Sequence, residues 1–150
     1  MLNQFTPASI DNEYCGHKLA LWLFYLLLFM KAGIGLNTIF NGHFVASSAD
    51  GLRADTFSPA GVQAVISLYA IWGVGQITIC LLGILVAIRY RAMIPIMYTV
   101  FLLQHLGTKL VTYFLPIAKN AGSPGSVVNV VLLAIMIIGF ALSLRARTRA

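Results

Sequence analysis

Polar and ionisable side chains interrupt the long apolar segments of this 150-residue chain, and six of them are candidates for a binding site. Because such groups are costly inside a lipid bilayer, they are by default candidates for function and are expected to face other helices. At 1.5 Å per residue, four of the six, one from each apolar segment, lie roughly 18–22 Å from one end of their segment, near a bilayer midplane. The six candidate ligand-binding residues are Lys31, Gln76, Gln104, His105, Lys109 and Asn129.

The spacing of neighbouring residues predicts which helix faces meet. His105, Thr108, Lys109 and Thr112 recur at helical spacing and form a polar stripe that is expected to avoid lipid. A second stripe of small and polar residues on the preceding segment permits close helix approach. That stripe consists of Tyr69, Gly73, Gln76, Cys80, Gly83 and Ala87.

The segments that must position these residues are long enough to cross a membrane. Spanning about 30 Å of hydrocarbon takes roughly 20 apolar residues, and only a helix satisfies every backbone group there. Ser58–Pro59 and Ser123–Pro124 are typical of helix starts. We therefore predict an all-α, polytopic integral membrane four-helix bundle in a single domain. Its predicted helices are 19–40, 62–88, 92–114 and 127–144, with outer loops 41–61 and 115–126 and tails 1–18 and 145–150.

The composition indicates the class of protein, and the distribution of charge predicts the orientation of the chain in the membrane. The chain is 59% hydrophobic and 9% charged, which excludes a soluble globular enzyme and a nucleic-acid-binding module. Basic residues concentrate on one side of the predicted spans, so the positive-inside rule places both termini in the cytoplasm of a multi-pass protein of the plasma or inner membrane. The six on that side are Lys18, Arg89, Arg91, Arg145, Arg147 and Arg149, against Arg53 and Lys119 on the other.

The acidic residues are expected to lie outside the membrane-spanning helices. Asp11, Glu13, Asp50 and Asp55 all fall outside the predicted spans, so Lys31 and Lys109 have no intramembrane carboxylate as a partner. An enclosed ammonium without such a partner gives up its proton, binds an anionic ligand or lipid headgroup, bonds water and carbonyls, or meets an acid from another subunit. Lys109 lies near a helix end, from which its stem can also reach the interface.

The sequence lacks the residue patterns that metal binding, haem binding and most kinds of catalysis require. No His, Cys, Asp or Glu cluster has metal-ligand spacing, and His17 and His43 lie on opposite membrane surfaces from each other, which disfavours haem. We expect no cofactor, no metal and no catalytic residue, although an enzyme could still use His105 or a deprotonated Lys31 as its base. Aromatic residues among Trp22, Trp72, Tyr90, Tyr98 and Tyr113 are expected to anchor the interface.

The function predicted from these residues is binding, and possible transport, of a small anionic or polar ligand at the midplane cluster. Its partners would be the lipid bilayer, the ligand and further copies of the chain in a homo-oligomer. The alternative is an accessory or assembly subunit of a larger membrane complex, in which an intramembrane lysine pairs with a partner's acid.

Overall fold

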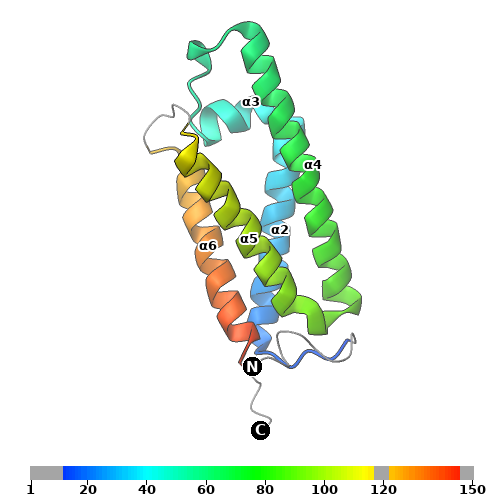
Figure 1. The fold of residues 1–150 in the computed structure, drawn as a ribbon. Coiled ribbons are helices and arrows are strands. Elements are labelled where there is room, and N and C mark those ends of the chain that lie inside the picture. Colours follow the sequence, from blue (N-terminus) through cyan, green and yellow to red (C-terminus); the bar gives the residue numbers. More distant parts are fainter. Residues whose placement is uncertain (1–11, 117–121, 146–150) are drawn as a thin grey trace.

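A computed structural model describes residues 12–116 and 122–145 of the chain. Of these residues 84% are helical and none forms a strand (Figure 1). Four helices are long and apolar enough, by length and composition, to cross a membrane. They are α2 (Lys18–Phe40), α4 (Pro59–Arg89), α5 (Ile94–Phe114) and α6 (Pro124–Ser143), with short helices α3 (Gly42–Phe44), η1 (Val45–Ala49), η2 (Ala54–Thr56) and η3 (Arg91–Met93) between them.

Local chemistry explains where the long helices begin. The Ser58 Oγ accepts a hydrogen bond from the Gly61 N–H at 3.2 Å, and Pro59 occupies the first helical position, so α4 starts three residues before the predicted span. Ser123 stands at the same position before α6, but its side chain makes no capping bond. Its carbonyl instead accepts from the Ser126 N–H at 3.0 Å. Helices α4 and α6 thus begin three residues before the apolar stretches from which they were predicted, each with a proline in its first turn.

Helix α2 is the centre of the packing. It lies against α4 and α6, while α5 packs mainly on α6, and α4 and α5 approach each other chiefly near their short connection (Figure 1). The closest approach of α2 and α4 is at Gly73, where an added Cβ would lie 2.9 Å from the Gly35 carbonyl oxygen. The small residues of α4 therefore hold this helix against α2 and away from α5.

An aromatic core fills the end of the bundle that contains Arg89 and Arg145. Phe24, Tyr98 and Phe101 are fully buried, and the Phe24 and Tyr98 rings stack edge to face with centroids 5.3 Å apart. The Tyr98 hydroxyl donates to the Ala20 carbonyl at 2.8 Å. The expectation of an interfacial anchor is therefore wrong for Tyr98, since this hydroxyl finds its partner inside the bundle.

The connection between α2 and α4 is more ordered than the outer loop that the sequence predicts. Helices α3 and η1 turn back across the end of the bundle, bury Val45 and Ala46, and bring η1 against α6 (Figure 1). The Asp50 N–H closes this turn by donating to the Val45 carbonyl at 2.8 Å. The segment folds over the bundle because its apolar side chains can be buried there.

The glycine contact between α2 and α4 leads to a stability prediction. We expect Gly73→Ala to lower the free energy of unfolding by about 1–3 kcal/mol, because the new methyl group would overlap α2. Gly75→Ala is the matched control: nothing lies within 4 Å of a Cβ there, and alanine favours a helix. Thermal unfolding of both variants in detergent micelles measures the difference. Equal stability of the two would contradict the close approach of α2 and α4.

Candidate functional site

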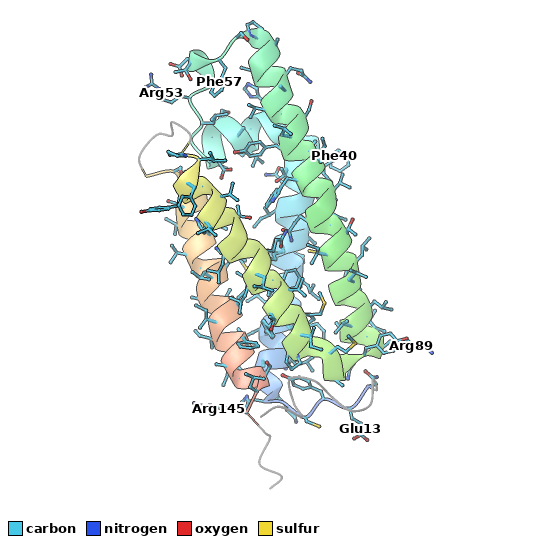
Figure 2. The ribbon with its side chains drawn as sticks, viewed as in Figure 1. Glu13, Phe40, Arg53, Phe57, Arg89 and Arg145 are labelled. Carbon is cyan, nitrogen blue, oxygen red and sulfur yellow. The ribbon has the colours of Figure 1, made fainter. Side chains whose placement is uncertain are left out.

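All six sequence-predicted residues line a single cavity of about 430 Å³. The cavity lies between α2, α4, α5 and α6, in the part of the bundle remote from Arg89 and Arg145, with η1 along its far end (Figure 2). Each long helix contributes at least one of the six: Lys31 from α2, Gln76 from α4, Gln104, His105 and Lys109 from α5, and Asn129 from α6. The structure thus brings all six residues to one cavity, whereas ligand binding by them stays a prediction.

Lys31 is the centre of a hydrogen-bond network inside the bundle. Its side chain is 5% exposed, and Nζ donates to Gln104 Oε1 at 3.1 Å and to Gln76 Oε1 at 3.5 Å. The same Nζ lies 5.1 Å from the centroid of the Phe101 ring, on whose face a cation is attracted. The amides and the ring therefore compensate the ammonium for part of its lost hydration.

The two glutamines also bond to each other. Gln104 Nε2 donates to Gln76 Oε1 at 3.0 Å, and Gln76 Nε2 donates to the thiol sulfur of Cys80 at 3.5 Å. The amides consequently join α4 to α5 at a level where these two helices otherwise pack little. Periodicity alone could not predict that these amides hold the lysine, because the relative rotation of helices is a property of the packed bundle.

His105 is buried beside this network with an unsatisfied ring nitrogen. It is 7% exposed, and its Nε2 has no hydrogen-bond partner among the residues that the structure describes. A buried polar atom without a partner is unusual in proteins, and a bound water, ion or ligand commonly satisfies such an atom. The imidazole is therefore free to bond a ligand in the cavity that it lines.

The remaining polar stripe of α5 reaches the same cavity. The Thr108 and Thr112 hydroxyls donate hydrogen bonds to backbone carbonyls one turn earlier, at 2.9 and 2.8 Å. The donor of each hydroxyl is therefore already used within α5. Lys109 is exposed at the cavity and makes no hydrogen bond or ion pair with the described part of the chain. Lys109 is therefore the more solvated of the two cations.

Asp50 is the cavity residue that sequence reasoning missed. The fold-back of η1 brings its carboxylate to the cavity, where Oδ2 accepts a hydrogen bond from the Tyr69 hydroxyl at 2.8 Å. Asp50 lies outside the four long helices, as the sequence predicts, and its carboxylate forms no ion pair with a described lysine, yet it lines the cavity. One signal was available: the run from 43 to 50 has no glycine or proline and is flanked by Gly42 and Gly51, which is compatible with a short helix.

The fold and cavity define an all-helical protein with four candidate membrane spans and a polar site between them. No protein-family model, curated protein or solved structure matches the chain. The geometry of the site is therefore the basis for every functional statement below.

The network around Lys31 is testable by a double-mutant cycle. We expect Gln104→Leu to lower the free energy of unfolding by about 1–3 kcal/mol, because it removes an acceptor from a buried ammonium. The cost should shrink in a Lys31→Met background, where no charge needs that acceptor. Gln63→Leu, on the exposed start of α4, is the control and should change little. Thermal or denaturant unfolding in micelles gives the coupling energy, and additive effects would contradict the network.

Proposed function

We propose that this protein crosses a membrane four times and binds, in the cavity beside Lys31, a small ligand that carries anionic or other acceptor oxygens. One observation supports the choice of ligand chemistry above all others: the network leaves more hydrogen-bond donors unused than acceptors. Lys31 has three N–H donors and uses two, and each of the two amides has two donors and uses one. Three N–H groups thus remain, one on each of Lys31, Gln76 and Gln104, in addition to the unpaired Nε2 of His105.

These donors favour an acceptor over a cation. A cationic ligand would bring further positive charge and further donors to a site where the Gln76 oxygen already accepts two hydrogen bonds. A carboxylate, phosphate or carbonyl oxygen would instead bond the remaining N–H groups, and charge-assisted bonds of this kind are the stronger ones.

The size and walls of the cavity suggest a ligand with an apolar body. A volume of about 430 Å³ lies in the range of small-molecule sites, which are mostly apolar with a few placed polar groups. Ile34, Trp72, Val128 and Leu132 supply such walls here. Transport of the ligand, through a homo-oligomer, would be an extension of this proposal that binding itself does not require.

We further propose that the end of the bundle with Arg89 and Arg145 lies in the cytoplasm of a plasma or inner membrane. Lys18 and Arg91 stand at the same end as these two arginines, whereas Arg53 is at the opposite end (Figure 2). This distribution supports the orientation through the positive-inside rule. Arg147, Arg149 and Lys119, which belong to the same argument from sequence, lie outside the described residues.

The alternative role as an accessory subunit of a membrane complex now depends on Lys109. Lys31 is enclosed by its own bundle, so a partner's acid could reach Lys109 but not Lys31 without opening the helices. Crosslinking in native membranes separates the two roles, because a reproducible stoichiometric partner would favour the subunit.

Ligand binding can be measured through Trp72, which lines the cavity, in a Trp22→Phe background that leaves Trp72 as the only tryptophan. We expect octanoate and octyl phosphate to change its fluorescence at lower concentration than octylamine does. Lys31→Met should weaken binding of both anions about ten- to a hundredfold, because a hydrogen bond to a charged group contributes about 1.5–3 kcal/mol.

Lys18→Met is the matched control, since Lys18 is exposed at the far end of α2 from the cavity. It should leave both affinities unchanged. Equal binding of octanoate and octylamine, or equal binding of octanoate by the Lys31→Met and wild-type proteins, would refute the proposal.

The orientation has its own test at Cys15, which is exposed at the end with Arg89, whereas Cys80 is buried. In sealed right-side-out vesicles, a membrane-impermeant maleimide should label Cys15 only after permeabilisation. A Cys15→Ser, Asp55→Cys variant should react in intact vesicles, because residue 55 is exposed at the opposite end. The reverse pattern would invert the proposed topology.

A further inference from the structure

The cavity has a second polar end, formed by Asp50 and Tyr69. Both residues line the same cavity as Lys31, and the Tyr69 hydroxyl donates to Asp50 Oδ2 at 2.8 Å. No described cation lies within ion-pair distance of this carboxylate. The cavity therefore holds a carboxylate that accepts one side-chain hydrogen bond and has lone pairs to spare.

The surroundings of Asp50 fix its position at the end of the cavity. Its Oδ1 lies so near the first turn of α6 that a Cβ added to Gly125 would be 2.9 Å from it. The positive end of a helix dipole stabilises a negative charge placed there. On the other side, the Asp50 N–H is bonded to the Val45 carbonyl, which ties the residue to η1.

The distance between the two polar ends follows from the helices that carry them. Tyr69, beside Asp50, and Gln76, beside Lys31, are seven residues apart on α4, which corresponds to about 10 Å along the helix axis. Apolar residues on three helices line the cavity between these ends: Ile34 on α2, Trp72 on α4 and Val128 on α6. The polar Asn37, Thr38 and Asn129 line it as well, so the cavity has donors at one end, an acceptor at the other and mixed walls with apolar patches between them.

We propose that the ligand is a zwitterionic or amino-terminated amphiphile: its anionic group binds the donors around Lys31, its ammonium group binds Asp50, and an apolar spacer of about 10 Å joins them. This inference rests on the proposed function, because it adds a second contact to an anion already held by the Lys31 cluster. Opposite charges at the two ends select against ligands that carry only one of the two groups.

Lys109 is the other charged group at the cavity, one turn beyond His105 on α5. Its side chain is less enclosed than that of Lys31, and its positive charge opposes an ammonium at Asp50. An ammonium at Asp50 still gains a charge-assisted hydrogen bond to the carboxylate.

The test compares carboxylates that differ only at their far end, by titration of Trp72 fluorescence in the Trp22→Phe protein. The probes are octanoate, ω-aminooctanoate, and the shorter and longer ω-aminobutanoate and ω-aminododecanoate. We expect ω-aminooctanoate to bind about tenfold more tightly than octanoate, with the shortest amino acid losing this advantage because it cannot reach both ends. Asp50→Asn should abolish the advantage and leave octanoate binding at least as tight as before.

Tyr69→Phe provides a second variant that keeps the carboxylate, and it should retain most of the advantage. Asp55→Asn, which alters an exposed acid of the same connection, is the control and should change nothing. If octanoate binds but ω-aminooctanoate binds no better, or if Asp50→Asn keeps the preference, the zwitterion proposal fails while the proposed function stands. If no carboxylate binds the wild-type protein, both fail.

Discussion

The enclosure of the Lys31 ammonium in an apolar bundle is the constraint on which the rest of the structure depends. A cation taken out of water needs acceptors, and here two amide oxygens and an aromatic ring surround it. Because Gln76 belongs to α4 and Gln104 to α5, their bonds to Lys31 and to each other also fix the spacing of these two helices. The same interaction thus keeps the charge inside and sets one end of the cavity.

The cavity exists because α4 packs along α2 and makes few contacts with α5. The contact between Gly35 and Gly73 draws α4 toward α2, while α5 packs on α6, so the helices of the hairpin separate beyond their short connection. Side chains of the aromatic core fill the lower part of this space around Phe24, Tyr98 and Phe101. In the upper part, Trp72 and Tyr69 line the walls beside the polar groups, and a volume of about 430 Å³ remains between them.

Periodicity in the sequence was enough to find the polar face of α5 and the small-residue face of α4, because a helix places residues three and four apart on one side. It also placed four of the six candidate residues, one from each helix, at a similar depth, and all six line the cavity. It misjudged Tyr98, whose hydroxyl bonds the Ala20 carbonyl, since aromatic residues near a helix end suit both an interface and a core. It also left Asp50 in an outer loop, because the fold-back of η1 depends on contacts with α4 and α6 that are distant in sequence.

The sequence by itself determined that this chain forms apolar helices long enough to cross a membrane and that each of them carries a polar residue at a similar distance from one end. Those properties depend on composition and helical spacing, which are local. Only the tertiary structure decided that the Lys31 ammonium is held by Gln76 and Gln104, that the His105 Nε2 is left unpaired, and that Asp50 closes the far end of the same cavity. These features depend on the rotation of each helix about its axis and on a fold-back over the bundle, both of which are set by packing among helices that are far apart in the chain.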